Sequence, residues 1–389
     1  MKKGFILIEL LAVIVILAII ALIATPIVLN IINETKESAN LRSAEMYLDA
    51  VEQSMARGML QNKYISDGTY NISSNGDICL NENCSETLKV EVEGEKPNKG
   101  NISIINGSID GASIELNNKT LGISGNGGVA PVCILSSDST VKGTNLGAKY
   151  ECEVRPGTKN IFFVLGTNSD GSINLIMDSN INDKGVAIKS NDVTGVKSVE
   201  WINETDYNKS GGLGSYADLS GFGDTEHYGP VTAMNFIYNA TKDWINIPNM
   251  VINYTSNKAG EIYSLQTNKN EVKIISKYGN ETASYINLKA RLPKITEVEG
   301  VEKCASAINN IYESLGSCPL WLVNYMSESE HYSTASGKVN ISGVYGYSVL
   351  DVEACPTQLG VSYDGYTGTE AVCGFGRSDG IRPVITVKL

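Results

Sequence analysis

The N-terminal apolar run limits the possible folds of this chain more than any other part of it. Positions 5–24 are apolar throughout, except for Glu9. At ~1.5 Å of rise per residue, a helix of this length crosses the ~30 Å hydrocarbon core of a bilayer. Lys2 and Lys3 precede the run, so the positive-inside bias places the N-terminus in the cytoplasm and the rest of the chain outside. Leu22-Ile23-Ala24 does not fit the small-residue site of a cleaved signal, so we expect a retained anchor.

Glu9 is the only ionisable residue in this run, and such a residue in lipid usually has a function and a neutralising partner. The order Lys-Lys-Gly-Phe-Ile-Leu-Ile-Glu-Leu-Leu, followed by a long apolar helix, resembles the N-terminus of the type IV prepilins. In that family a dedicated peptidase cuts after the glycine, here Gly4, and methylates the new terminal residue, here Phe5. The family's glutamate corresponds to Glu9 and its helix-bending proline to Pro26. Ile6 departs from the threonine that is most frequent in the family, at a tolerant position.

This resemblance implies a structural subunit, a major or minor pilin, of a type IV pilus-like surface filament. The implied partners are other pilins in a homo- or hetero-oligomer, the prepilin peptidase, the inner-membrane platform of the assembly machine, and a host or surface ligand. The protein would be a single-pass protein of the cell membrane before assembly, and part of an extracellular filament afterwards. Two other functions stay open: a pseudopilin of a type II secretion or competence DNA-uptake machine, and a membrane-tethered surface enzyme. The simplest competing interpretation is a signal anchor with an incidental glutamate.

The composition is typical of an exported protein and argues against nucleic acid as a partner. The 389 residues carry a formal net charge of −12, which disfavours binding to nucleic acids and anionic lipid surfaces. Eight cysteines, an even number, indicate disulfides in an oxidising compartment. They form four pairs that are close in sequence, and we expect these four disulfides: Cys79 with Cys84, Cys133 with Cys152, Cys304 with Cys318, and Cys355 with Cys373.

Beyond the proline, residues 26–62 predict an amphipathic continuation of the same helix. One apolar stripe recurs at three- and four-residue steps and consists of Leu41, Ala44, Leu48, Val51, Met55 and Met59. Most charged side chains of the segment lie off this stripe. We expect the stripe to pack on a sheet, because helical stripes are usually part of a core. Pro26 removes a backbone donor and should bend the helix where it leaves the membrane.

Residues 63–124 predict the antiparallel sheet on which this helix packs, a pilin-like β subdomain. Short β-rich runs such as Ile102–Ile105 and Ala112–Leu116 alternate with dipeptides that favour tight turns. These dipeptides are Asp67-Gly68, Asn75-Gly76, Asn106-Gly107 and Asp110-Gly111. The Gly-rich residues 125–128 lack the Gly-Lys-Ser/Thr of a phosphate loop, and they predict a linker to the next domain.

Residues 129–389 predict a second, β-rich extracellular domain. Three segments, Lys289–Pro293, Trp321-Leu322 and Gly380–Thr386, resemble a C-terminal module of Gram-positive surface proteins. That module is similar to the C-type-lectin-like fold of formylglycine-generating enzymes. The resemblance implies that an arginine of the last segment holds a loop by hydrogen bonds, ahead of a closing strand. Structural roles are therefore expected for Arg291, Trp321 and Arg382.

Catalytic chemistry finds little support in the sequence. The copper-binding cysteine pair of the formylglycine-generating enzymes has no clear counterpart, and no G-x-S-x-G motif occurs. Of the two histidines, His227 and His331, the second lies beside Glu330 and is better explained as a surface residue than as a general base. We therefore expect no enzyme activity, no cofactor and no metal site.

Together these patterns predict an α+β protein. A leader peptide (residues 1–4) would precede a transmembrane helix (residues 5–25), and the amphipathic part of that helix would pack on an antiparallel sheet. A β-rich C-type-lectin-like domain would follow.

Overall fold

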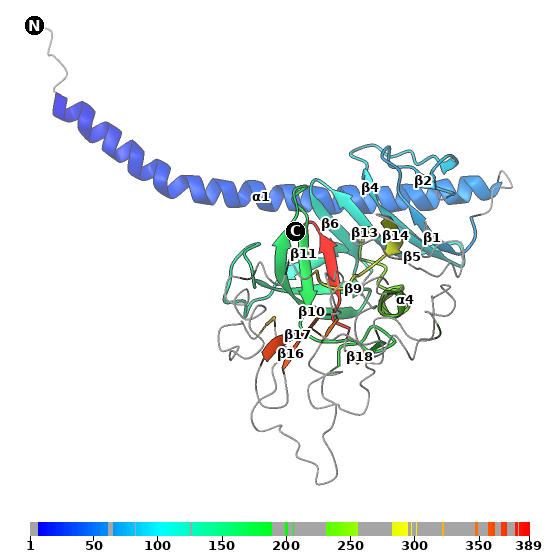
Figure 1. The fold of residues 1–389 in the computed structure, drawn as a ribbon. Helices are drawn as coiled ribbons and strands as arrows, with labels where there is room; N and C mark the ends of the chain where they lie inside the picture. Colours follow the sequence, from blue (N-terminus) through cyan, green and yellow to red (C-terminus); the bar gives the residue numbers. More distant parts are fainter. Residues whose placement is uncertain are drawn as a thin grey trace, which may run out of the picture.

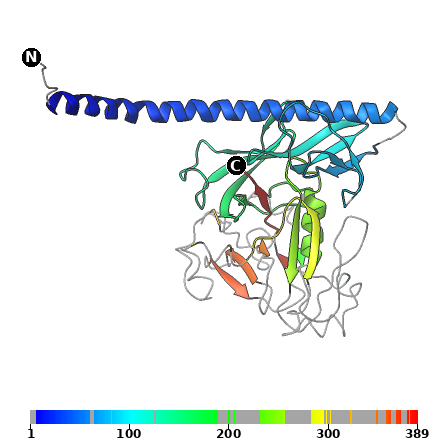
Figure 2. The same ribbon diagram turned by 90° about the horizontal axis from the view of Figure 1, so that it is seen from above.

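The computed structural model describes most of the chain as far as residue 294, and shorter stretches after it. The described residues are 7–60, 65–81, 83–124, 127–188, 199–200, 205, 231–255, 282–294, 297, 301, 321–322, 347–348, 357–361, 367–371, 378–379 and 381–389. Helix α1 (Leu7–Leu60) runs along one side of the body, and its N-terminal half extends beyond the body (Figures 1 and 2). Antiparallel sheets build most of the body, so the layout is α+β, as predicted.

Helix α1 is one continuous helix of 54 residues that passes through Pro26. At 1.5 Å of rise per residue it is ~80 Å long, far longer than a membrane span. Figure 1 shows its N-terminal part bending away from the line of the rest. Proline lacks the N–H that would bond to the preceding turn, and a bend near this residue is the expected consequence.

The C-terminal half of α1 packs on a five-stranded sheet, here called sheet A. Its strands are antiparallel and lie in the order β1 (Gly68–Asn71), β4 (Lys99–Ile105), β5 (Ser108–Leu116), β6 (Lys119–Ile123) and β7 (Val129–Pro131). Ala44, Val51 and Met55 of the predicted stripe are at most 2% exposed, and they pack on Ile102, Ile104 and Ile114 of the sheet. The packing of the stripe on a sheet is therefore confirmed.

Tyr47 shares this core, although the predicted stripe did not include it. Its side chain is fully buried, and its hydroxyl donates a hydrogen bond to the backbone oxygen of Gly76 at 3.0 Å. Burial is the main reason that the pKa of Tyr47 is raised above its ordinary value, with the charge of Asp77 adding to the rise. The hydroxyl ties helix α1 to the loop ahead of β2 (Ile78–Cys79). β2 pairs with β3 (Thr87–Leu88).

Two tight turns connect the central strands of sheet A. Asn106 and Gly107 join β4 to β5 with φ values of 53° and 76°, and Asn117 and Asn118 join β5 to β6 with φ values of 49° and 63°. Positive φ at both central residues is the type I′ geometry, which suits the twist of a hairpin and favours Asn and Gly. The Asn106-Gly107 turn follows the prediction.

The prediction of a turn at Asp110-Gly111 is wrong, because Gly111 lies inside β5. The glycine allows close packing here. A Cβ atom at Gly111 would lie 2.0 Å from Cδ1 of Ile245, a residue far along the chain in the part of the protein that follows sheet A. A glycine inside a strand often marks such an approach rather than a turn.

The predicted linker at residues 125–128 is also wrong. Ser124 N donates to the oxygen of Gly128 at 2.8 Å, and Ile123 pairs with Val129, so β6 and β7 form a hairpin across this stretch. Sheet A therefore extends to Pro131, beyond the predicted end of the pilin-like subdomain at residue 124. Glycines suit both linkers and hairpin turns, and the pairing partner that decides between them lies outside the local pattern.

The second lobe, here called the head, is centred on a sheet named sheet C. Its antiparallel strands lie in the order β19 (Val384–Val387), β11 (Ile173–Met177), β10 (Thr158–Thr167), β9 (Lys149–Arg155) and β8 (Cys133–Leu135). Helix α4 (Val231–Thr241) and the hairpin of β13 (Met250–Thr255) and β14 (Thr282–Leu288) lie beside it. Smaller pairings join β12 (Val199–Glu200) to β18 (Ser378–Asp379), and β15 (Tyr347–Ser348) to β16 (Thr357–Val361) and β17 (Thr367–Ala371).

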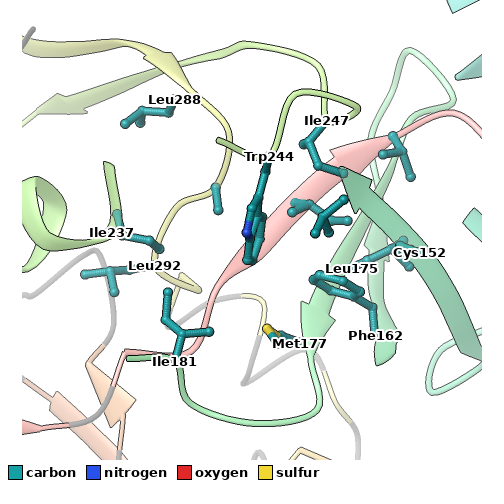
Figure 3. Packing of buried hydrophobic residues seen from close by; sticks show 14 of the residues in the cluster. Cys152, Phe162, Leu175, Met177, Ile181, Ile237, Trp244, Ile247, Leu288 and Leu292 are labelled. Carbon is teal, nitrogen blue, oxygen red and sulfur yellow. The ribbon is translucent and has the colours of Figure 1, made fainter. Parts of the chain in front are cut away.

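Trp244 lies at the centre of the head core (Figure 3). Its ring meets that of Phe162 edge to face, with centroids 6.2 Å apart. Figure 3 shows side chains from α4, sheet C and the segment after β14 around it, among them Ile237, Leu175 and Leu292. The head is thus one core assembled from distant parts of the chain.

The packing of α1 on sheet A predicts the effect of Met55→Ala. Met55 is 2% exposed, so its truncation should lower the free energy of unfolding by about 2–5 kcal/mol, since Met→Ala in a core leaves a cavity. Met46→Ala is the matched control, because Met46 is 48% exposed on the same helix and should change stability by less than about 0.5 kcal/mol. Urea unfolding of the detergent-solubilised protein measures both. Equal effects would mean that α1 does not pack on sheet A through this stripe.

Candidate functional site

The first candidate site is the apolar surface of the N-terminal half of α1. The large hydrophobic side chains described from Leu11 to Ile32 are 42–78% exposed, on every side of the helix. The hydroxyl of Thr25, a polar side chain within this half, donates to the oxygen of Ala21 at 2.6 Å and so needs no water. This is the one helix of the described chain that is long and apolar enough to span a membrane. The amphipathic second half instead buries one stripe on sheet A.

Two of the predicted processing and assembly residues, Glu9 and Pro26, lie within helix α1. Glu9 has helical backbone within α1, and its side chain is outside the described residues. Gly4 and Phe5 are also outside them. Pro26 lies inside the helix, where the apolar run ends.

The two lobes are joined by contacts that are far apart in sequence. Lys388 Nζ lies 2.6 Å from Glu115 Oε1 of β5, and both side chains are 15% exposed. The backbone N–H of Thr120 also donates to the backbone oxygen of Lys388 at 2.9 Å. Asn246 Nδ2 donates to the oxygens of Ile123, in sheet A, and Glu153, in sheet C, at 2.8 and 3.0 Å. These contacts fix the head on the sheet that carries α1.

Arg382 is the largest fully buried side chain of the described chain, being 1% exposed. Its guanidinium donates to the backbone oxygens of Met177, Trp321 and Leu322. The Trp321 ring stacks on Phe163 of β10, with centroids 5.7 Å apart and planes 26° apart. Arg382 therefore holds the segment at Trp321 against sheet C, just ahead of strand β19.

Arg291 is also buried, and it forms an ion pair with Glu297. Arg291 Nη1 donates to Glu297 Oε2 at 2.8 Å, Nη2 contacts Oε1, and Asn174 of β11 donates to the same Oε1 at 2.9 Å. Its backbone bridges to Val384 of β19. The Glu297 side chain is mostly buried, and Arg291 neutralises its carboxylate.

Two of the four expected disulfides are present. Cys79 pairs with Cys84 around the β2–β3 loop, and Cys133 pairs with Cys152 between β8 and β9. Cys304, Cys318, Cys355 and Cys373 lie outside the described residues, as do both histidines. Within the described ranges, no group of three or more His, Cys, Asp or Glu side chains is placed to hold a metal ion.

Lys289 is a buried ionisable residue that sequence reasoning missed. It is 4% exposed, and its ammonium donates to the oxygen of Ile247 at 2.7 Å. Burial lowers its pKa to about 7, since desolvation disfavours the charged form. Its position in the sequence Leu288-Lys289-Ala290 could have indicated this burial, because the lysine stands between two residues of the core.

No model of a known protein family matches the chain, and no curated protein or solved structure gives a match either.

Lys289 predicts a rise of stability with pH. Between about pH 7 and pH 10 the unfolded chain keeps the Lys289 proton while the folded chain has lost it, so the unfolded state binds more protons. Stability should then rise by up to about 1.4 kcal/mol per pH unit in this window. Urea unfolding of detergent-solubilised protein at several pH values measures the slope.

Lys289→Met should remove the part of the rise of unfolding free energy with pH that comes from this side chain. The matched control, Lys184→Met, changes an exposed lysine and should keep it. An unchanged slope in Lys289→Met would contradict the assignment of the rise to this side chain.

Proposed function

We propose that this protein is a structural subunit of a type IV pilus-like filament, held together by the N-terminal halves of α1 and carrying the head outward. The observation that supports it most strongly is an apolar helix exposed on every side, joined rigidly to a folded body that covers only its other half. Such a helix needs an apolar surrounding, and either a bilayer or neighbouring copies of the helix can supply one.

Glu9 explains why neighbouring copies of the helix, and not the bilayer alone, finally surround the apolar half of α1. Cleavage after Gly4 leaves a charged amine on Phe5, four residues before Glu9 in the sequence. An axially shifted neighbour brings its own Phe5 amine to this carboxylate and neutralises both groups. Opposite charges attract far more strongly in an apolar core than in water, while an unpaired carboxylate there carries a desolvation cost of several kcal/mol. The pair thereby favours subunits that enter in register.

The head fits the second part of the proposal, a C-type-lectin-like display domain. Its support is the C-terminal strand β19 lying beside β11, with Arg382 holding the Trp321 segment next to it. The disulfide between β8 and β9 and the lobe contacts at Lys388 give such a domain a fixed position on α1. A rigid display domain would project from the filament surface without needing its own membrane contact.

The first prediction of this proposal concerns processing. Peptide mass spectrometry of protein from cells should find an N-terminal peptide that begins with N-methyl-Phe5. Gly4→Leu should block the cut and leave peptides that begin at Met1, because the peptidase recognises the glycine junction. Recovery of unprocessed Met1 peptides, or of peptides that begin after Ala24, from surface material of the unaltered strain would contradict the proposal.

The second prediction concerns assembly. Glu9→Leu should still insert in the membrane, because the change removes a charge from the apolar run, but filaments should be absent or sparse. Glu34→Leu is the control, since Glu34 lies past the apolar run and is exposed on α1; its filaments should be as numerous as in the unaltered strain. Immunogold electron microscopy counts the filaments and distinguishes surface pili from a short pseudopilus. Normal filament numbers with Glu9→Leu would show that apolar packing alone drives assembly.

A further inference from the structure

A cleft of about 480 Å³ lies at the junction of the two lobes. One wall comes from the sheet A side, with strand β1 and the Cys79–Asn81 segment. The other comes from the head, with the C-terminal end of α4, Asn249 and the Asn287–Lys289 end of β14. Its volume falls in the range of small-ligand sites, and junctions between lobes are where such sites often occur.

The walls of this cleft are held together before any ligand arrives. Asn249 Nδ2, on the head side, donates to Asn71 Oδ1 of β1 at 3.0 Å. The backbone N–H of Asn249 donates to Asn101 Oδ1 at 3.2 Å, and Asn101 Nδ2 donates to the oxygen of Ile245 at 3.2 Å. On the other side, the Cys79–Cys84 disulfide fixes the segment that begins at Cys79. A preformed site of this kind loses little conformational entropy on binding.

Irregular backbone is concentrated at the same place. Asn287, which lines the cleft, has a φ of 57°, a left-handed conformation that asparagine adopts more readily than most other residues. The pairing of β13 with β14 is interrupted by a register shift between Met250 and Ile252, on strand β13 beside it. Bulges are over-represented next to functional sites, where they re-aim side chains. The paired strands β13 and β14 thus depart from regular pairing at the end that lines the cleft.

The chemistry of the lining suits a ligand rich in hydroxyl groups. Four asparagines line the junction, namely Asn71, Asn81, Asn249 and Asn287. Asn81 already bonds to Ser85 and Glu86, and Asn249 bonds to Asn71, but an amide has two N–H donors and an oxygen that accepts twice, so each keeps further capacity. Tyr70, whose hydroxyl donates to the backbone oxygen of Ser66 at 2.7 Å, and Tyr238 add aromatic rings that offer apolar area. Of the lining residues that the structure describes, Leu80 is the one aliphatic side chain, so this part of the lining offers no series of apolar pockets for peptide side chains. Sugars combine hydroxyls with apolar ring faces and match this lining.

The charges of the lining add a preference for an acid. Among the described lining residues, Lys242 and Lys289 stand against a single carboxylate, that of Asp243, although the whole chain has a formal net charge of −12. The protonated ammonium of Lys289 has three donors, and the described residues provide it with one acceptor, the oxygen of Ile247. A carboxylate beside it would offset the desolvation that lowers its pKa.

From this cleft we infer a saccharide-binding site that selects sugars bearing a carboxylate, such as uronic or sialic acids. The amides would bind ring hydroxyls, the tyrosines would contact ring faces, and the two lysines would receive the acid group. The inference does not depend on filament assembly, because all its residues belong to one chain.

Isothermal titration calorimetry of the detergent-solubilised full-length protein tests the site. The probes are trigalacturonic acid and 3′-sialyllactose, with the methyl ester of the trimer and lactose as their neutral counterparts. We expect at least one acidic probe to bind, and its neutral counterpart to bind at least about tenfold more weakly. Triglutamate, a peptide with the same number of carboxylates as the trimer, should not bind. Absence of binding by both acidic probes, or equal binding of triglutamate, would overturn the proposal, and equal binding of the neutral sugar would overturn the role of the acid.

Three variants locate the binding. Asn81→Ala and Lys242→Met change exposed lining residues, so the fold should persist, and each should weaken binding of the acidic sugar by about tenfold or more. Lys184→Met removes an exposed lysine outside the cleft and should leave the affinity unchanged. Equal affinity in Lys242→Met and Lys184→Met would place any sugar binding elsewhere and refute this site. Because the titration uses the isolated protein, its failure is distinguishable from a failure to assemble filaments in cells.

Discussion

The use of one helix in two different environments governs the rest of this structure. The first half of α1 exposes apolar side chains on all sides, whereas the second half buries a single stripe on sheet A. Backbone hydrogen bonds inside the helix satisfy the polar groups of both halves, which is why a helix and not a strand can pass between the two environments. Sheet A must then lie entirely along the second half, since any strand on the first half would cover the apolar surface.

The head depends on the same constraint, because its position is set through sheet A. Strand β19, at the end of the chain, completes sheet C, and Lys388 directly after it pairs with Glu115 of β5. Gly111 allows Ile245 of the head to approach β5 closely. The head is therefore placed by contacts made late in the sequence with an early sheet. Such contacts are slow to form in folding, because a long loop must close first.

These long-range contacts also mark the limit of what could be predicted from the sequence. The long helix, its apolar stripe and the Asn106-Gly107 turn are local patterns, and the structure agrees with them. The errors at Asp110-Gly111 and at the predicted linker arose where a glycine fits two structures and a distant partner decides between them. The burial of Tyr47 and Lys289, and the cleft beside Lys289, likewise depend on neighbours far away in sequence.

The disulfide between Cys133 and Cys152 has a mechanical consequence. The chain leaves sheet A at Pro131 and enters sheet C at Cys133, so a pull between α1 and the head loads this short connection first. β8 is an edge strand and could peel from β9 under tension, but the disulfide joins the two strands covalently. The bridged residues are 19 apart, and without the bridge that length of chain could extend by about 60 Å before tightening. With it, the head and the helix behave under load as a nearly inextensible pair.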